Sequence, residues 1–206
     1  KNQLSLATNN AGTTQFAYNV DGIRTQKING NSTTHFVVDS NQGYDVHGCT
    51  NAVSAGCAGA AAQVLNEITG TSRTVYTYGD DLISQRSNNQ THFYHYDGLG
   101  STRQLSNQSG TFTDSYDYQP FGEILNQTGT TQNNYLFTGE QFDQTLNQYY
   151  LRARYYNQQT GRFTQQDSWM GNSQDPITLH KYLYANVDPA LMTDPSGNMA
   201  TISELM

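Results

Sequence analysis

Charged side chains are scarce in this chain of 206 residues: they make up 13% of it, about half of the usual share. Disordered chains are usually rich in charge and poor in aromatics, whereas this one has 15 tyrosines, so the composition argues against disorder. Hydrophobic residues reach only 35% and the mean hydropathy is -0.71, which supplies little for a core of packed helices. Tyrosine and threonine suit half-buried strands, so we predict a β protein.

The chain also lacks a basic cluster and a long apolar run. Its net charge is -7, and no basic run exceeds the set of Arg152, Arg154 and Arg162, so we expect no nucleic-acid partner. No stretch approaches the roughly 20 apolar residues of a membrane span. Lys1 opens in a polar run without a signal peptide, which leads us to expect a piece of a longer chain.

Cysteine is limited to Cys49 and Cys57, which lie in a stretch rich in glycine and alanine. In an exported parent protein they would close a small loop by a disulfide, and two free thiols are the alternative. A zinc site needs four ligands, and His47 is followed by no ligand pair at suitable spacing. We therefore expect no metal and no cofactor.

Hairpin-like repeats occupy residues 1–90. The pattern is an aromatic residue, any residue and a tyrosine, with a glycine a few positions on, about every 20 residues. It is carried by TQFAYNVDG (14–22), THFVVD (34–39) and TVYTYGDDLISQ (74–85). A Gly/Ala/Cys insertion interrupts it at about 40–62. Each hairpin has one apolar face, so it is stable only with neighbours stacked beside it.

Longer motifs follow in the second half of the chain. They are THFYHYDGLGSTR (91–103), YDYQPFGE (116–123), YLFTGEQFD (135–143), YYLRARYYN (149–157), TGRFTQQD (160–167), YLYAN (182–186) and DPSG (194–197). In this order they resemble the Rhs-repeat-associated core domain at the C-terminal end of Rhs and YD-repeat proteins. The resemblance covers roughly residues 91–199. We assign residues 91–198 to this core domain and residues 199–206 to the segment after a cleavage site.

The resemblance implies an all-β fold. Twisted antiparallel β-hairpins form the terminal part of a spiral β-shell, or cocoon, and the core domain curls inward as a plug. The implied partners are the rest of the shell and the protein's own C-terminal toxin segment, which the shell encapsulates. A polymorphic toxin or an insecticidal toxin complex C-component is the type of protein implied, secreted or on the bacterial cell surface.

The same resemblance implies a single-turnover aspartic autoprotease. Asp167 and Asp194 match the family's two aspartates, and the implied scissile bond is Asn198–Met199. Two carboxyl groups held close together share a proton, so one can activate water while the other polarises the scissile carbonyl. Such a site acts once, because its substrate is its own chain.

Three arginines stand near these aspartates. We expect Arg152 and Arg154 to be structural, stacked on tyrosines or paired with a carboxylate: Asp143, Glu140 or Asp167. Arg162 comes five residues before Asp167, and we assign it to the reactive site.

Two other readings remain open. The family has leucine where this chain has Asn198, which favours a non-cleaving YD-repeat module of a surface or adhesion protein, binding carbohydrate or protein through its tyrosines. The second alternative is a structural shell fragment whose protease is inactive. Under either alternative, Asp167 and Asp194 are turn or cap residues.

Overall fold

The computed structural model describes residues 3–10, 12–39, 62–79, 81–198 and 200–202. Its main element is an eleven-stranded sheet in which every strand is hydrogen-bonded to the next one along the chain. The strands are β1 (Leu6–Asn9), β2 (Gly12–Tyr18), β3 (Arg24–Asn29), β4 (Ser32–Asp39), β5 (Gln63–Thr69), β6 (Ser72–Tyr78), β7 (Leu82–Ser87), β8 (Gln90–Tyr96), β9 (Thr102–Asn107), β10 (Phe112–Tyr118) and β11 (Ile124–Thr128). All neighbours are antiparallel, which confirms the predicted all-β hairpin fold.

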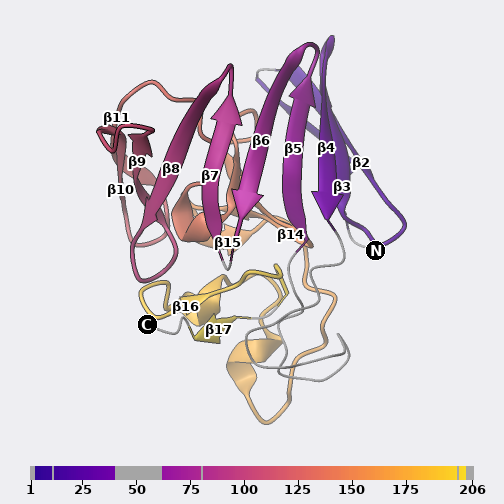
Figure 1. Cartoon of the computed structure of the whole chain (residues 1–206). Coiled ribbons are helices and arrows are strands. Elements are labelled where there is room, and N and C mark those ends of the chain that lie inside the picture. The colour runs from indigo at the N-terminus through magenta and orange to yellow at the C-terminus, as the bar shows by residue number, and fades with distance from the viewer. Residues whose placement is uncertain (1–2, 11, 40–61, 80, 199, 203–206) are drawn as a thin grey trace.

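Smaller elements make up the rest. A four-stranded sheet contains β12 (Gln141–Asp143), β13 (Gln148–Leu151), β14 (Arg154–Asn157) and β15 (Arg162–Phe163), and a two-stranded one contains β16 (Met192–Thr193) and β17 (Thr201–Ile202). Short 3-10 helices occur at η1 (Phe137–Gly139), η2 (Pro176–Leu179) and η3 (Ala185–Val187). In Figure 1 the large sheet is a curved wall, and much of the C-terminal part lies behind and below it.

Two-residue turns close several hairpins. The β3–β4 and β5–β6 turns place Gly30 and Gly70 at φ values of 56° and 57°, and the β7–β8 turn uses Asn88 and Asn89 at 51° and 62°. Turns of this kind match the twist of the flanking strands but need positive φ, which glycine and asparagine tolerate best. Local turn chemistry therefore favours the repeated hairpins.

A register shift recurs near the end of every second strand. It falls directly before Tyr18, Tyr78, Tyr96 and Tyr118 in strands β2, β6, β8 and β10, and before Val38 in β4. Three of these tyrosine hydroxyls donate to a backbone carbonyl about 15 residues earlier in the chain: Tyr18 to Leu4 at 2.7 Å, Tyr96 to Leu82 at 2.6 Å and Tyr118 to Thr102 at 2.8 Å. Tyr96 and Tyr118 thus fasten the end of their own strand to the start of the strand before it, and Tyr18 binds the residues just before β1.

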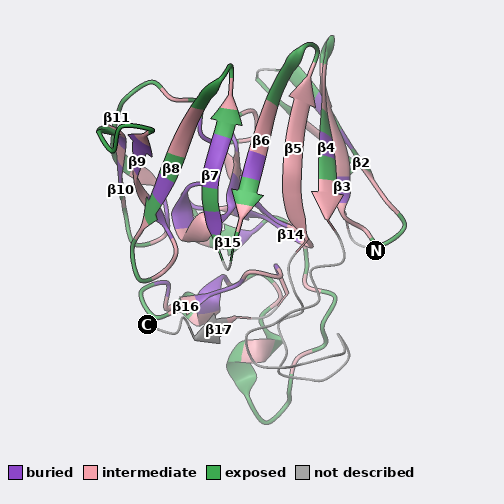
Figure 2. Cartoon of the chain, viewed as in Figure 1, coloured by how far each residue is buried: buried purple, intermediate pink, exposed green. Residues whose placement is uncertain are grey.

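An aromatic side chain that points into the core lies two positions before each of these tyrosines and before Val38. These residues are Phe16, Phe36, Tyr76, Tyr94 and Tyr116, all buried. The last three belong to one hydrophobic cluster with the C-terminal part, which contributes Tyr149, Tyr156, Phe163 and Tyr184. Figure 2 shows buried segments on the wall and on the chain behind it. The sheet therefore buries its aromatic face against the C-terminal part.

The predicted insertion lies between two paired strands. β4 and β5 pair from Thr34↔Thr69 to Asp39↔Gln63. Residues 40–61, and with them Cys49 and Cys57, lie outside the described part of the chain.

Glu67 on β5 links the wall to the chain packed inside it. Its carboxylate accepts hydrogen bonds from the Tyr76 hydroxyl at 3.1 Å, from Asn134 Nδ2 at 2.8 Å and from Gln141 Nε2 at 2.6 Å. Burial is the largest influence on this group and raises the pKa of the Glu67 carboxyl, although these donors and Arg24 oppose it. The folded state therefore binds this proton more tightly than the unfolded state does.

We expect Glu67→Gln to flatten the pH dependence of stability. A carboxyl whose pKa is raised on folding contributes stability that is fully present below its unfolded pKa, near 4.5, and is lost as pH rises through the folded pKa. Relative to the variant, the wild type should become less stable as pH rises through this window. Urea denaturation at intervals from pH 4 to pH 8 measures the difference, and a constant difference would contradict the argument.

Candidate active site

The Asp-Pro-Ser-Gly motif forms a tight turn after β16. Gly197 N–H donates to the Asp194 carbonyl at 3.3 Å. The Asp194 side chain accepts twice on Oδ1, from Ser196 Oγ and from the backbone N–H of Asn198, each at 3.1 Å. An aspartate that bonds to the backbone just after itself is a common device for closing a turn. Asp194 is only 3% exposed, so this turn is part of the folded interior.

Arg154 on β14 contacts the carboxylates of both Asp167 and Asp194, the two predicted catalytic residues. Its Nη2 lies 2.9 Å from Asp167 Oδ2 and 3.5 Å from Asp194 Oδ2. Since both oxygens contact one nitrogen, they can be no farther apart than the sum of these distances. The guanidinium is 4% exposed and lies 3.6 Å from the centroid of the Phe163 ring. Burial lowers the pKa of Arg154, while the two aspartates act against that shift.

Arg154 also binds the backbone of the turn. Its Nε donates to the Gly197 carbonyl oxygen, and its Nη1 donates to the Lys181 carbonyl at 3.1 Å. One guanidinium thus contacts both carboxylates and the peptide chain that follows Asp194. Its planar fork of donors is suited to several such contacts at fixed geometry.

Arg152 supports the turn from the other side. It occupies the turn between β13 and β14 at φ +47°, and its Nη1 donates to Glu140 Oε2 at 2.5 Å and to the Pro195 carbonyl at 2.6 Å. Burial raises the pKa of the Glu140 carboxyl, which Arg152 partly offsets. Arg152 therefore has the structural pairing that the sequence indicates.

Asp167 reaches the site from the chain that leaves β15. Its N–H donates to the Lys181 carbonyl at 2.9 Å, and its Oδ1 accepts from Trp169 N–H at 2.8 Å. Its other carboxylate oxygen, Oδ2, pairs with Arg154. The chain segments after β15 and after β16 thus meet at one arginine.

Arg162 lies elsewhere. Its backbone pairs with Asn157 and Leu183, its side chain is exposed, and it lines a separate hollow of about 420 Å³ beside Phe121. The arginine that contacts both carboxylates is Arg154, which we expected to have a structural pairing, and not Arg162, which we assigned to the reactive site. Of the two residues at the implied cleavage site, Asn198 is partly buried, and Met199 lies outside the described residues.

A cleft of about 400 Å³ opens beside the site. Arg152, Arg154, Ser196 and Asn198 line it, together with Gln166 and Ser168, the two neighbours of Asp167. The cleft thus borders the two neighbours of Gly197 and the two neighbours of Asp167. Two carboxylates and a guanidinium around a held peptide can activate water and stabilise an oxyanion.

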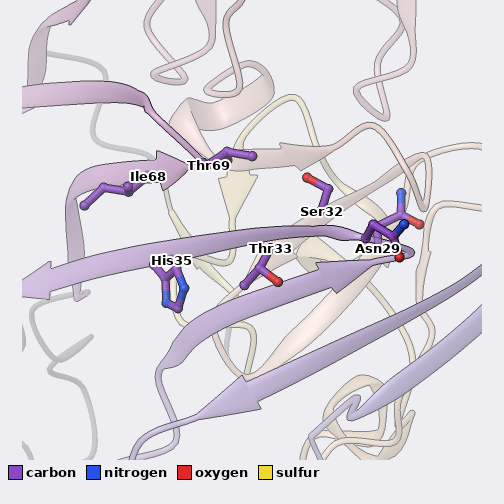
Figure 3. A pocket seen from close by; sticks show the side chains of 8 residues that line it. Asn29, Ser32, Thr33, His35, Ile68 and Thr69 are labelled. Carbon is purple, nitrogen blue, oxygen red and sulfur yellow. The ribbon is translucent and has the colours of Figure 1, made fainter.

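Another hollow, of about 750 Å³, lies between the tips of the β3–β4 and β5–β6 hairpins. Its lining includes Asn29, Ser32, Thr33, His35, Ile68 and Thr69 (Figure 3). These side chains are mostly amides and hydroxyls, which suit neutral polar ligands better than catalysis. Among the residues that the structure describes, no cluster of His, Cys, Asp and Glu could hold a metal ion.

Comparison with known proteins agrees with this fold. The family model described as the teneurin YD-shell matches residues 60–190. The "tRNA3(Ser)-specific nuclease WapA" of Bacillus spizizenii is 31% identical over 191 residues, which is 89% of this chain and 7% of that protein. "Salivary gland surface protein 1" of Aedes aegypti is 32% identical over 137 residues, which is 65% of this chain and 4% of that protein.

Solved structures share the fold at low sequence identity. The TcdB2-TccC3-Cdc42 crystal structure superimposes with a TM-score of 0.63 at 17% identity, over 94% of this chain and 10% of that one. A Photorhabdus luminescens Tc holotoxin pore gives a TM-score of 0.64 at 17% identity, over 94% of this chain and 9% of that one. This chain therefore spans a small fraction of the proteins it resembles. With a family model matching most of its length and a hairpin wall of the same fold, the chain belongs to the YD-shell family of Rhs/YD-repeat proteins.

Proposed function

We propose that this chain is the shell-closing core of an Rhs-type toxin protein and cuts its own backbone after the Asp194-Pro195-Ser196-Gly197 motif. The observation that carries the proposal is the contact of Asp167 and Asp194 with the same nitrogen of Arg154, beside the peptide that follows the motif. The cut would release a C-terminal toxin segment held inside the shell.

The chemistry follows from the contacts. Arg154 offsets the repulsion between the two carboxylates, so they can lie close together. Asp167 Oδ2 is placed to take a proton from water, which enters through the cleft. Since the substrate is the adjoining chain, positioning replaces an encounter between two molecules, which lowers the barrier.

The relatives fit a toxin role. WapA is named a tRNA nuclease, and one of the similar structures is of a Tc holotoxin pore. With a net charge of -7 this chain is poorly suited to bind RNA, so we assign any nuclease activity of such a protein to a part outside this sequence. We propose that the rest of the shell and the released segment are its partners and that the whole protein is secreted or displayed on a cell surface.

The test uses the chain with a small folded reporter domain fused after Met206. We expect the wild type to split into two pieces and Asp167→Asn and Asp194→Asn to stay whole, as measured by intact mass over time. Asp117→Asn is the matched control, because its carboxylate is exposed and pairs with Arg103 away from the site. If the wild type remains intact through long incubation, the proposed cleavage is wrong.

A second function would then apply: a non-cleaving YD-repeat module of a surface or adhesion protein. The neutral hollow in Figure 3 favours it, because amide and hydroxyl groups such as those of Asn29, Ser32 and Thr33 suit carbohydrate hydroxyls. The similarity to the salivary gland surface protein points the same way. In that case Arg154 and its two aspartates hold the C-terminal turn in place and do no chemistry.

A further inference from the structure

We propose that the bond that breaks is Gly197–Asn198, one residue before the bond that the family resemblance indicates. This inference rests on the proposed self-cleavage and adds its position. It comes from the contacts around a single peptide group: both the carbonyl and the N–H of the Gly197–Asn198 peptide are bound by groups of the site.

The carbonyl side is held by Arg154. Its Nε donates to the Gly197 oxygen, while its Nη2 contacts Asp167 and Asp194. When water attacks the carbonyl carbon, negative charge develops on this oxygen. A buried guanidinium already in place stabilises that charge without reorganisation, which is usually the largest single contribution to such a reaction.

The amide side is held by Asp194. The N–H of Asn198 donates to Asp194 Oδ1 at 3.1 Å and to Ser196 Oγ at the same distance. This nitrogen is the leaving group if the Gly197–Asn198 bond breaks. A carboxyl oxygen within hydrogen-bond distance can pass a proton to it as the bond opens.

The cleft borders the residues on either side of Gly197. Gly197 itself is buried, but Ser196 and Asn198 line the cleft, together with Arg154 and Ser168. The attacking water would therefore approach the Gly197 carbonyl carbon from this cleft, between the peptide and the Asp167 segment.

The step balances with water alone. Water adds to the Gly197 carbonyl carbon as Asp167 takes one of its protons, and the oxyanion forms against Arg154. The proton taken by Asp167 passes to Asp194, and from there to the Asn198 nitrogen as the C–N bond breaks. The products are a carboxylate at Gly197 and an amino group on Asn198.

The first amino acid of the released piece decides between the two bonds. With the reporter fused after Met206, we expect N-terminal sequencing to begin with Asn198 and the mass of the larger fragment to end at Gly197. A released piece that begins with Met199 would overturn this inference and leave the proposed self-cleavage standing. A chain that never splits would overturn the proposed function itself, and this inference with it.

Arg154→Lys tests the role given to the carbonyl contact. Lysine keeps the positive charge but has no donor that corresponds to Nε, so we expect cleavage at the same bond to be slower by about 100-fold, the usual effect of losing one such donor. Thermal unfolding of the variant checks that it still folds. Cleavage at the wild-type rate by a folded Arg154→Lys chain would overturn the role of Arg154 at the carbonyl.

Discussion

Replacing Arg24 with methionine should lower the free energy of unfolding by about 3 kcal/mol. Arg24 on β3 is 3% exposed, and its guanidinium carbon lies 4.1 Å from the centroid of the Tyr150 ring and 4.5 Å from that of Phe36. Its Nη1 donates to the Tyr155 hydroxyl at 2.5 Å and lies 3.5 Å from Asp143 Oδ2. Arg24 therefore joins the N-terminal hairpins to the β12–β15 sheet.

The size of this effect follows from what methionine would leave behind. Removing one partner of a buried ion pair typically costs about 3–5 kcal/mol, because the other partner stays buried. Asp143 would keep Lys27, whose Nζ lies 2.6 Å from Oδ1, so the lower end of that range applies. The Tyr155 hydroxyl and Gln141 Oε1, which now bind Arg24, would each lose a hydrogen bond.

Arg103→Met is the matched control for Arg24→Met. Arg103 lies 2.6 Å from Asp117, but the two side chains are 40% and 53% exposed, and exposed pairs contribute about 1 kcal/mol or less. Urea denaturation at neutral pH measures both variants. If Arg24→Met changed stability as little as Arg103→Met does, apolar packing alone would hold the N-terminal hairpins to the inner sheet.

The eleven-stranded wall could be predicted from the sequence because short local motifs specify its strands and turns. The pair formed by an aromatic residue and a tyrosine two positions later marks β2, β6, β8 and β10, as in Tyr76 with Tyr78 and Tyr94 with Tyr96. Glycine and asparagine mark the turns between them. The sequence could not show the register shift before the second tyrosine. That shift depends on which residues of the partner strand lie opposite, and the pattern along one strand does not specify them.

The pairing of Arg154 with Asp167 was among the sequence-based expectations, but its contact with Asp194 was not, for a geometric reason. Distance along the chain favoured Arg162, but the β14–β15 hairpin turns back at Gly161, so Arg162 pairs with Asn157 at its closed end. Thr164 N–H donates to the Tyr155 carbonyl at 2.9 Å, which brings the residues after it alongside Arg154. If the pairing of the β14–β15 hairpin is continued away from its turn, the residues that follow Phe163 lie beside Arg154.

The prediction that Asp167 and Asp194 share one site came from the family resemblance alone. The two residues belong to different segments, and neither has a local pattern that refers to the other. Arg154 contacts both, and the Lys181 carbonyl accepts from both Arg154 and the backbone of Asp167. Such contacts between distant segments arise only from the completed fold.

Replacing Gly197 with alanine should slow self-cleavage by about 100-fold, the effect expected when a reacting group moves by about 1 Å. A Cβ at Gly197 would lie 2.0 Å from the Leu151 carbonyl oxygen and 3.1 Å from Arg154 N. Both neighbours are backbone atoms of the β13–β14 turn, so the segment containing Gly197 would have to move away. The contacts of Ala153 N–H with Ser196 and of Arg154 Nε with Gly197 would be lost.

Gly110→Ala separates this clash from backbone strain. Gly197 and Gly110 have φ values of +71° and +80°, so alanine is strained at both, by about 1–2 kcal/mol. A Cβ at Gly110, however, meets no atom within 4 Å. Both variants should lose some stability in urea denaturation, but only Gly197→Ala should slow the splitting of the reporter fusion. If the two variants split equally fast, close docking of Gly197 against the β13–β14 turn is not what positions the peptide for cleavage.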